Sequence, residues 1–386
     1  MRVALFDYKV TANNPIGSCH RRLLEGLCRD YEFTVFAVEF ENPCPERVRF
    51  VRVPVCTRPL ALLFVVYHLV APLVYWLYRL RTGRRFDLVQ MVESNLSFGT
   101  VCYAHFCHRG YLRSDWKHAG AVGLRGWLRY LDHWLHALAE PWVFRRAERI
   151  VVPSQGLMRE LEDVYPFVQG KVTVIANAVD VEHVAAPSDF EREAFRRARG
   201  VAPGDVVLVF VALGHFERKG LALVLDALRL LACPKLKLWV VGGEPDLVRA
   251  WQARLRNTDL AGQAVFFGLQ RDVRPFLWGA DALVFPSLRE TFPLVALEAA
   301  AAGLPLIVTR LNGVDEFMRD QETGFLVDRT ARAVAEGLRH FIELPPQKRR
   351  RMGEVAREAV KEYSADRFVE SWHRFLGTGW NLRRTQ

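Results

Sequence analysis

Residues 281–309 read DALVFPSLRETFPLVALEAAAAGLPLIVT and decide the fold that the second half of the chain is expected to adopt. The stretch predicts a buried strand, a turn, a helix over about 293–302 and a further strand. Pro293 suits the first helical position, and Gly303 suits the residue just past the helix end. A strand, a helix and a strand in this order form the repeating unit of a parallel α/β sheet.

Two glutamates flank the start of this helix. Glu290 lies in the turn before it and Glu298 about two turns into it, so the pair could contact groups roughly 10 Å apart along one ligand. The backbone amides of Thr291, Phe292 and Leu294 are expected to face an anion, because a helix N-terminus binds anions. Carboxylates beside a bound phosphate fit a ligand that also carries hydroxyls, as sugars do.

Length and composition indicate a globular protein of two domains. The chain has 386 residues, of which 51% are hydrophobic and 25% are charged, which excludes a disordered protein. Lys and Arg outnumber Asp and Glu by 53 to 43, giving a formal net charge of +10. This excess favours an anionic partner such as a nucleotide, a phospholipid or a nucleic acid.

The cysteines and the N-terminus both favour a cytoplasmic protein. The seven cysteines form no CxxC pair and no Cys/His zinc pattern, so free thiols in a reducing compartment are expected. The sequence opens directly with a strand over Arg2–Phe6, and no signal peptide is evident.

Strands and helices alternate in both halves of the chain, which predicts an α/β protein with two doubly wound parallel sheets. The expected organisation is an N-terminal domain over 1–180, a charged linker over 181–204, a C-terminal domain over 205–362, and a final helix and tail over 363–386 that pack back on the N-terminal domain.

Gly17 is expected in the loop after the first strand, where a missing side chain lets backbone approach a ligand. A purely structural turn is the alternative. The full Gly-x-Gly-x-x-Gly fingerprint of dinucleotide-binding proteins is absent, which counts against a nicotinamide-dependent enzyme.

Residues 59–78 (PLALLFVVYHLVAPLVYWLY) carry no charge unless His68 is protonated. Twenty such residues are long enough to span a bilayer, although Pro72 interrupts them. Three interpretations stay open: a core helix, a helix lying in the plane of a membrane surface, and a membrane span. The arginines that follow suit lipid headgroups or a solvated helix end.

Residues 109–149 place tryptophans among basic residues in a helical pattern. Such interleaving occurs at membrane surfaces and in nucleic-acid binders. No nucleic-acid-binding module accompanies it, so we expect an anionic membrane surface and no nucleic acid as the partner.

Two histidines lie near the end of a buried strand over Val101–His105, which continues as FCHRGYLR. Ligands of open α/β sheets bind at the carboxyl ends of strands, so we expect His105 or His108 to be catalytic. Glu93 and Asn95 follow the preceding strand and are further candidates for the acceptor side of the site.

Arg218 and Lys219 follow a strand over Val206–Ala212 in a glycine-flanked loop. A planar guanidinium and an adjacent ammonium suit a diphosphate. Together with Glu290 and Glu298 they predict one site with cations for a diphosphate, a helix N-terminus for its oxygens and acids for hydroxyls. A nucleotide-sugar has all of these groups.

These motifs, in this order, resemble the retaining glycosyltransferases of family 4, which have the GT-B fold of two facing doubly wound, Rossmann-like domains. The strongest match is the pair Glu290 and Glu298, separated by seven residues, and the resemblance covers nearly the whole chain. Supporting pieces are VVPSQGL at 151–157, IANAVD at 175–180, FERKG at 216–220 and ETGFLV at 322–327.

The resemblance implies roles for the donor site. Glu298 would hold the ribose hydroxyls of the nucleotide, and Glu290 would contact hydroxyls of the donor sugar. Arg218 and Lys219 would neutralise the diphosphate, and Gly17 would bring the first loop close to the donor phosphates.

The resemblance also implies a mechanism. His105 matches the histidine at the acceptor–donor interface of the family, with His108 as the second choice. The leaving diphosphate would help to deprotonate the acceptor on the same face, so the anomeric configuration would be retained. No metal and no other cofactor is expected, because Arg218, Lys219 and the helix dipole supply positive charge.

The expected function is therefore transfer of a hexose-type sugar to a glycan or lipid-linked acceptor in polysaccharide or glycolipid synthesis, by a cytoplasmic enzyme peripheral to the inner face of the membrane. Two alternatives stay open. One is a nucleotide-sugar epimerase of the same fold, and the other is a non-catalytic, membrane-associated protein that binds sugar nucleotides.

Overall fold

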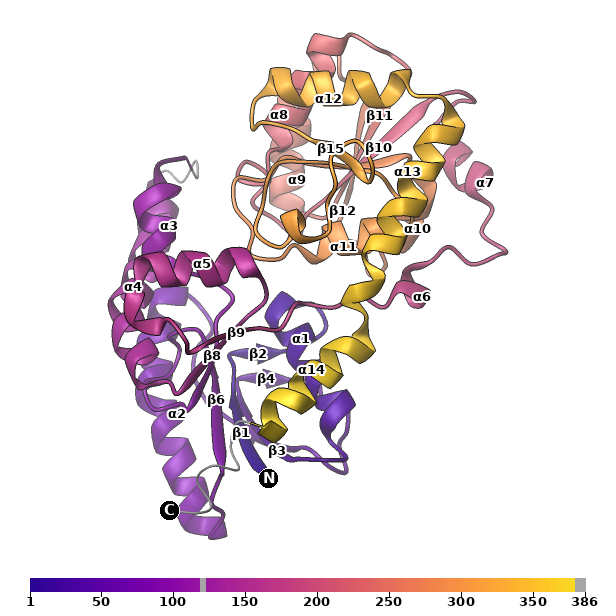
Figure 1. The fold of residues 1–386 in the computed structure, drawn as a ribbon. Helices are drawn as coiled ribbons and strands as arrows, with labels where there is room; N and C mark the ends of the chain where they lie inside the picture. Colours follow the sequence, from indigo (N-terminus) through magenta and orange to yellow (C-terminus); the bar gives the residue numbers. More distant parts are fainter. Residues whose placement is uncertain (119–122, 379–386) are drawn as a thin grey trace. The chain divides into compact units, whose positions relative to one another are not determined.

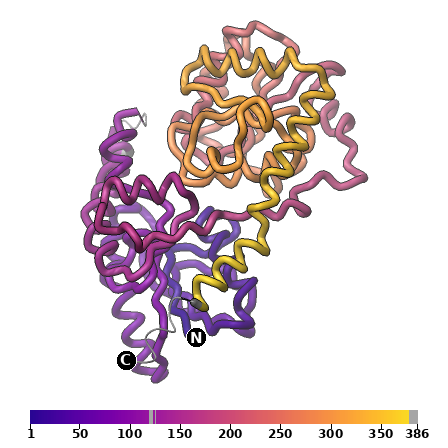
Figure 2. Tube along the Cα trace, viewed as in Figure 1, coloured from indigo at the N-terminus to yellow at the C-terminus, as the bar shows by residue number. Residues whose placement is uncertain are grey.

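The computed structural model of the protein describes residues 1–118 and 123–378. The chain folds into two compact units (Figure 1). Unit 1 comprises Met1–Ala178 and Ala365–Gln386, and unit 2 comprises Val179–Ser364. Figure 2 follows the chain from unit 1 into unit 2 and back, so the C-terminal helix, drawn in yellow, belongs to unit 1.

Unit 1 is built on a sheet of seven parallel strands in the order β5-β3-β1-β6-β7-β8-β9. The chain therefore first adds strands on one side of β1 and then on the other, so the direction of winding changes between β1 and β6. The strands are β1 (Arg2–Phe6), β3 (Glu32–Ala37), β5 (Arg49–Arg52), β6 (Leu88–Val92), β7 (Val101–Tyr103), β8 (Arg149–Val152) and β9 (Val172–Val174). Two short strands, β2 (Lys9–Val10) and β4 (Glu39–Phe40), pair separately.

Helices cover both faces of this sheet because successive side chains of a strand point to opposite faces. Val3 and Leu5 of β1 pack with residues of α1 (Pro15–Leu27) and α14 (Ala365–Thr378). Ala4 and Phe6 pack with residues of the helices on the other face. Those helices are α2 (Leu60–Thr82), α4 (Gly123–Arg146) and α5 (Gln155–Val164), with α3 (His108–Ser114) beside them (Figure 1).

The final helix is tied closely to the first. A Cβ atom on Gly26 of α1 would lie 2.4 Å from the Val369 side chain of α14, so the two helices approach as only glycine allows. Trp372 of α14 is completely buried in the core that α1 shares. This packing makes residues 365–378 part of unit 1.

Unit 2 is built on six parallel strands in the order β12-β11-β10-β13-β14-β15. This is the doubly wound order of dinucleotide-binding folds, and the direction of winding changes between β10 and β13. The strands are β10 (Val206–Val211), β11 (Leu236–Val241), β12 (Ala264–Gly268), β13 (Ala282–Phe285), β14 (Leu306–Val308) and β15 (Gly324–Leu326). Two Rossmann-like parallel sheets, as predicted, are confirmed.

The helices of unit 2 are α8 (Leu221–Leu231), α9 (Pro245–Leu255), α10 (Arg274–Gly279), α11 (Leu294–Ala301), α12 (Ala331–Glu343) and α13 (Pro346–Ala359). Residues 181–204, which we expected to form a linker, instead carry α6 (Val181–Val184) and α7 (Arg192–Arg197) within unit 2. Arg196 anchors this segment, because its guanidinium lies 3.0 Å from Asp281 Oδ2 at the start of β13.

The helix that follows β13 begins and ends close to the predicted residues. Pro293 is the N-cap and not the first helical residue, so α11 starts at Leu294. Gly303 has φ +79° just after the helix end. The Leu304 amide donates a hydrogen bond to the Ala299 carbonyl, and the Gly303 amide donates one to the Ala300 carbonyl, each at 2.9 Å. These two hydrogen bonds form a Schellman motif at the helix end.

Candidate functional site

The loops after β10 and β13 meet where the direction of winding changes in unit 2. Arg218 and Lys219 follow β10, and Ser287 and Glu290 follow β13. The Leu288 amide donates to the Arg218 carbonyl at 2.9 Å and connects the two loops. Ligands of doubly wound sheets bind at this place, outside the carboxyl ends of the strands.

A charged cluster, formed by Arg218, Lys219 and Glu290, occupies these loops. The Lys219 ammonium donates to Glu290 Oε1, and an Arg218 guanidinium nitrogen lies 3.8 Å from the same oxygen. Ser287 Oγ donates to this oxygen at 2.6 Å. Arg218 also donates to the Arg289 carbonyl at 2.7 Å, which fixes its direction.

The cluster is mostly buried, so its charges interact strongly. Burial lowers the pKa of Lys219, with the Glu290 charge acting against this. Burial alone would raise the pKa of Glu290, but the charges of Lys219 and Arg218 outweigh burial and leave that pKa lowered. The Lys219–Glu290 pair is therefore ionised at neutral pH, and Arg218 adds one positive charge that an anion can neutralise.

Gly220 lets the two loops approach. It has φ +88°, and a Cβ atom there would lie 2.2 Å from the Pro286 carbonyl oxygen. Any other residue at this position would push the β10 loop from the β13 loop. The glycine that ends the FERKG motif is thus a requirement of the cluster's geometry.

The other predicted donor residues lie around the start of α11. Glu298 is half-buried in the second turn of α11, and Thr291 is half-buried before the helix. Phe292 is buried, and a Cβ atom on Gly313 would lie 2.5 Å from its ring, so this ring packs against backbone. Leu294 is the first helical residue. These residues and Glu290 therefore belong to one continuous segment of unit 2.

His105 lies in unit 1, two residues after β7. Its Nε2 atom is buried and has no hydrogen-bond partner among the residues that the structure describes. Its ring packs edge-on against Tyr103 with centroids 4.2 Å apart. Burial, with a contribution from His20, lowers the pKa of His105 to about 3, so this imidazole is neutral.

A buried chain of polar groups that was not predicted from the sequence lies next to β1. His20 Nδ1 lies 2.8 Å from Asp7 Oδ2, and His20 Nε2 lies 3.0 Å from the side-chain amide of Gln90. Asp7 follows β1 directly, at the carboxyl end of a strand beside the change of winding. In the sequence, this position of Asp7 and the location of His20 one turn beyond Gly17 are the features that could have indicated these polar groups.

The acceptor-side candidates cluster at the ends of β6 and β7. His108 is the first residue of α3, and its Nε2 atom lies 3.2 Å from Glu93 Oε2. Glu93 has φ 47°, which turns its side chain at the strand end. Asn95 is buried, and its Oδ1 atom has no hydrogen-bond partner within the described part of the chain. The structure thus brings Glu93 and His108 into direct contact.

Gly17 lies in the first turn of α1 and not in a loop, which corrects our expectation. The helix begins early because Asn14 is its N-cap and Pro15 its first residue; Asn14 Oδ1 accepts from the Gly17 amide at 2.8 Å. A Cβ atom on Gly17 would lie 2.4 Å from the Lys9 carbonyl oxygen. A side chain at this position would collide with protein backbone, so packing within unit 1 is sufficient to explain the glycine.

Two helices of unit 1 expose apolar side chains along one face each. In the described residues, α2 is the one helix long and apolar enough to cross a membrane by length and composition, and a third of its most apolar window is buried. The exposed apolar side chains of α2 include Leu62, Val65, Leu69, Leu73, Trp76 and Leu80. Those of α4 are Leu124, Trp127, Tyr130, Trp134, Leu138 and Trp142.

The two helices contact each other, and we call their exposed side chains together the apolar face. Arginines lie beside its tryptophans: the Arg79 guanidinium is 4.6 Å from the Trp76 ring centroid, and that of Arg146 is 4.3 Å from the Trp142 centroid. Tryptophan and arginine together are typical of protein surfaces at the interface of a bilayer with water.

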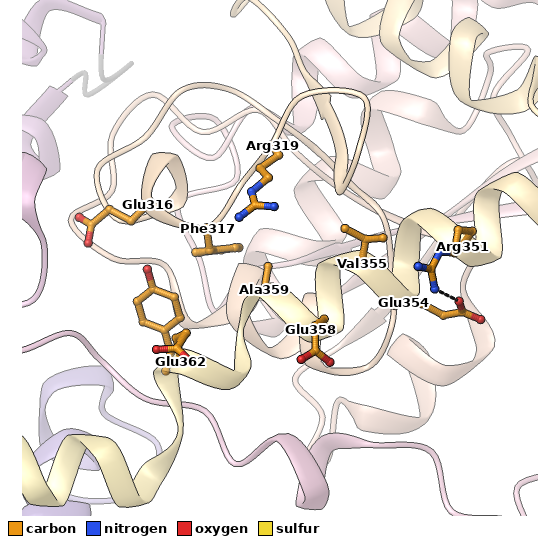
Figure 3. A pocket seen from close by; sticks show the side chains of 10 residues that line it. Glu316, Phe317, Arg319, Arg351, Glu354, Val355, Glu358, Ala359 and Glu362 are labelled. Carbon is orange, nitrogen blue, oxygen red and sulfur yellow. Dashed lines mark hydrogen bonds and ion pairs between the residues drawn. The ribbon is translucent and has the colours of Figure 1, made fainter.

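A hollow of about 690 Å³ opens elsewhere in unit 2, beside α13 (Figure 3). Its side chains include Glu316, Arg319, Glu354 and Glu358, and none of the predicted donor residues lines it. Size alone does not make it the functional site. The charged cluster is the better candidate site, because cations and the change of winding coincide there.

Comparisons with known proteins agree with this architecture. Residues 191–359 match the family model described as glycosyl transferases group 1, and residues 19–183 match the model of glycosyltransferase family 4. The first match lies within unit 2. The second match lies in unit 1, except for residues 179–183, which belong to unit 2.

A curated relative is the lipopolysaccharide core biosynthesis glycosyltransferase LpsE of Rhizobium meliloti, which is 30% identical over 242 residues. The match covers 61% of this chain and 66% of LpsE, so the chain spans just under two thirds of that relative's length.

Two solved structures share the fold over almost the whole chain. The lipopolysaccharide glycosyltransferase WaaG superposes with a TM-score of 0.77 at 19% identity, covering 98% of this chain and 100% of WaaG. HepE of Anabaena, solved with UDP-glucose, superposes with a TM-score of 0.73 at 17% identity, covering 98% of this chain and 100% of HepE. With both halves matched by family models and the whole chain by these structures, the protein belongs to glycosyltransferase family 4 and has the GT-B fold.

Proposed function

We propose that the protein transfers a sugar from a nucleotide-diphosphate donor to a hydroxyl of a glycan or lipid-linked acceptor and retains the anomeric configuration. The observation that carries the proposal is the charged cluster of Arg218, Lys219 and Glu290 at the change of winding between β10 and β13. Membership of the family and the UDP-glucose bound to HepE support a nucleotide-sugar as the ligand.

The donor diphosphate is proposed to bind Arg218 and Lys219. A diphosphate that accepts hydrogen bonds from Lys219 competes with Glu290, and the carboxylate then becomes available for the sugar hydroxyls. The first amides of α11, at Leu294, add the positive end of a helix dipole. Glu298, in the second turn, is assigned to the ribose hydroxyls.

The proposed chemistry leaves the diphosphate as both leaving group and base. The acceptor oxygen forms a bond to the anomeric carbon while the bond from that carbon to the phosphate oxygen breaks, and the electron pair leaves with the diphosphate. A diphosphate oxygen on the same face takes the acceptor proton, so the configuration is retained. Arg218 and Lys219 stabilise the departing charge, and the mechanism requires no divalent cation.

His105 is proposed to act as a neutral hydrogen-bonding group. The lowered pKa keeps its imidazole uncharged, so it offers one donor and one acceptor to a sugar hydroxyl and does not serve as a permanent cation. The acceptor is proposed to bind unit 1 near Glu93, Asn95 and His108. Gly17 remains a candidate for contact with the donor phosphates.

We further propose that the apolar face of α2 and α4 binds an anionic membrane from the cytoplasmic side. One side of α2 lies in the core of unit 1, where Tyr67 and Ala71 are completely buried, while Leu69 on the other side is 70% exposed. A helix with one face in the protein core suits binding in the membrane plane. The name of LpsE, which refers to lipopolysaccharide core biosynthesis, supports a lipid-linked acceptor.

A screen of nucleotide-sugars for thermal stabilisation, beginning with UDP-glucose, identifies the donor, since a bound ligand raises the unfolding temperature. The donor is then incubated with the protein alone and with glycan or glycolipid acceptors. Release of nucleoside diphosphate with a glycosylated acceptor supports the proposal. A changed sugar without acceptor would indicate an epimerase, and binding without turnover a non-catalytic protein.

A further inference from the structure

Two cysteines of unit 1, one at the end of α1 and one in the connection between β4 and β5, contact each other through their sulfur atoms. Cys28 Sγ lies 2.8 Å from Cys44 Sγ, and both residues are free thiols. The bonded sulfurs of a disulfide lie about 2.0 Å apart. The two sulfur atoms therefore need to approach by less than about 1 Å to be joined.

Cys28 is held at the C-terminus of α1. It is the C-cap residue of this helix, and its amide donates to the Leu24 carbonyl at 2.9 Å. Its side chain is buried in the core that also contains Leu24 and Leu27. The position of the Cys28 sulfur is therefore set by the helix and by the core of unit 1.

Cys44 is held within a compact turn. It lies between Pro43 and Pro45, whose rings restrict the backbone on both sides. The Cys44 amide donates to Asn42 Oδ1 at 2.9 Å, and the Cys44 carbonyl accepts from the Val48 amide at 2.9 Å. The side-chain amide of Asn42 also donates to the Val48 carbonyl at 2.9 Å. These hydrogen bonds fix the backbone that carries the second thiol.

The connection between β4 and β5 is attached to unit 1 at a second place, near the start of α1. Glu41 Oε2 accepts hydrogen bonds from the Ala12 amide at 2.8 Å and from the Arg21 guanidinium at 3.1 Å. These bonds and the contact between the two sulfurs keep the connection alongside the helix. A covalent bond between the sulfurs would preserve this arrangement.

The two sulfurs differ in their access to solvent. Cys28 is 8% exposed, whereas Cys44 is half-buried, so a reagent in solution reaches Cys44 first. Burial, followed by the contact with Cys28, raises the pKa of Cys44 to about 11. The charge of Glu25 adds to this rise, and that of Arg47 opposes it. Because the thiolate is the reactive form, oxidation at neutral pH is slow.

We propose that Cys28 and Cys44 form an intramolecular disulfide with a small-molecule disulfide as the oxidant. The Cys44 thiolate attacks one sulfur of the oxidant, and a first small thiolate leaves. The Cys28 thiolate then attacks the Cys44 sulfur of the mixed disulfide and expels the second small thiolate. The two cysteines lose two electrons and two protons, and the oxidant takes up both and leaves as two small thiols.

This bond would make the stability of unit 1 depend on the redox state of its surroundings. It would close residues 28–44, which contain β3 and β4, into a covalent loop. A cross-link restricts the unfolded chain, so the oxidised protein should unfold at a higher temperature than the reduced protein. The proposal does not depend on the proposed function, because the pair is defined by contacts within unit 1 alone.

The test uses full-length protein in mixtures of reduced and oxidised glutathione at about pH 8.5, where thiolates are more abundant. Remaining thiols are alkylated, and mass spectrometry of peptides locates each disulfide. We expect a disulfide between Cys28 and Cys44, and a glutathione adduct at the exposed Cys56. The equilibrium constant for the cross-link should be at least about ten-fold larger in folded than in urea-unfolded protein.

Variants separate the pair from the other thiols. Cys44→Ser should abolish both the cross-link and the rise in unfolding temperature on oxidation, and Cys28→Ser should leave a glutathione adduct on Cys44. Cys233→Ser, at a half-buried cysteine of unit 2, is the matched control and should form the cross-link as the unchanged protein does. If Cys28→Ser does not fold, Cys44→Ser gives the answer. An equilibrium constant no larger in folded than in unfolded protein, or a glutathione adduct at Cys44 that persists beside an intact Cys28, would overturn the proposal.

Discussion

The Lys219 ammonium donates a hydrogen bond to Glu290 Oε1 and thereby joins the loops that follow β10 and β13 in unit 2. In this arrangement the carboxylate neutralises one of two adjacent cations, and the same cations are those proposed to bind the donor diphosphate. Donor binding therefore has to exchange an internal ion pair for an external one. Both the stability and the ligand affinity of unit 2 should depend on this pair.

Removing one partner of the pair should destabilise the protein. Lys219→Met leaves Glu290, whose side chain is 12% exposed, with Arg218 as its nearest cation. The loss of one partner of a buried ion pair costs about 3 kcal/mol. Urea unfolding, monitored by tryptophan fluorescence, measures this change.

The double variant Lys219→Met with Glu290→Gln is the matched control. It removes both charges, so most of the stability should return, because a missing pair costs far less than a broken one. If the two variants are equally unstable, the ion pair is not the cause.

Glu298→Ala should weaken donor binding without unfolding the protein. The carboxylate is assigned to the ribose hydroxyls, and a charge-assisted hydrogen bond contributes about 1.5–3 kcal/mol, or roughly ten- to a hundred-fold in affinity. Calorimetric titration with the donor measures the effect. Glu336→Ala, at an exposed glutamate of α12, should bind as the unchanged protein does. Equal affinities for all three proteins would remove Glu298 from the donor site.

His105 should make the protein less stable as the pH falls. The unfolded chain takes up a proton at this residue near pH 6.5, whereas the folded protein does so only near its pKa of about 3. The stabilisation is therefore complete above pH 6.5 and is lost towards pH 3, by up to about 1.4 kcal/mol per pH unit. The free energy of unfolding, measured at several pH values between about 7 and about 4.5, should fall less steeply with decreasing pH for His105→Gln than for the unchanged protein. Parallel curves would show that His105 is not held neutral.

Donor binding should not require an added divalent cation. Arg218 and Lys219 already supply positive charge at the proposed diphosphate position. Donor affinity measured with and without Mg²⁺ or Mn²⁺ should be the same. Binding that occurs only with one of these ions would contradict the proposed donor site.

The apolar face should bind anionic vesicles. Leu69→Glu places a charge on this face, where the leucine is 70% exposed. The variant loses the transfer free energy of one leucine, so its vesicle partition coefficient, measured by co-sedimentation, should fall at least about ten-fold. Leu230→Glu, at a leucine of α8 that is 59% exposed, is the matched control and should bind normally. Equal binding to neutral and anionic vesicles would exclude a contribution of the arginines.

Much of the fold could be predicted from the sequence because buried parallel strands are short apolar runs. The strand at 2–6 was predicted with the bounds that the structure shows, and the strand predicted early in the stretch 281–309 is β13. The start of α1 was expected only beyond Gly17, although Asn14 and Pro15 form a recognisable N-cap and first residue. That error put Gly17 in a loop, where the family resemblance implied a contact with the donor phosphates.

The candidate site could be predicted only in part, since sequence gives residue types but not their partners. The order of the motifs placed Lys219 and Glu290 in the same domain, yet their direct hydrogen bond depends on how two loops meet across β10 and β13. Glu93 and His108 were both expected on the acceptor side, yet their direct contact and the stacking of His108 on His136 depend on how α3 and α4 pack. Whether residues 59–78 form a core helix could not be predicted either, since both faces of that helix are apolar.

The most direct test of the proposed activity is to incubate the protein with its donor and a candidate acceptor, and to follow the anomeric proton of the product by NMR while nucleoside diphosphate is measured in parallel. We predict that one nucleoside diphosphate is released for each sugar transferred and that the product keeps the anomeric configuration of the donor. Inverted product, or conversion of the donor to another sugar in the absence of acceptor, would contradict the proposed function.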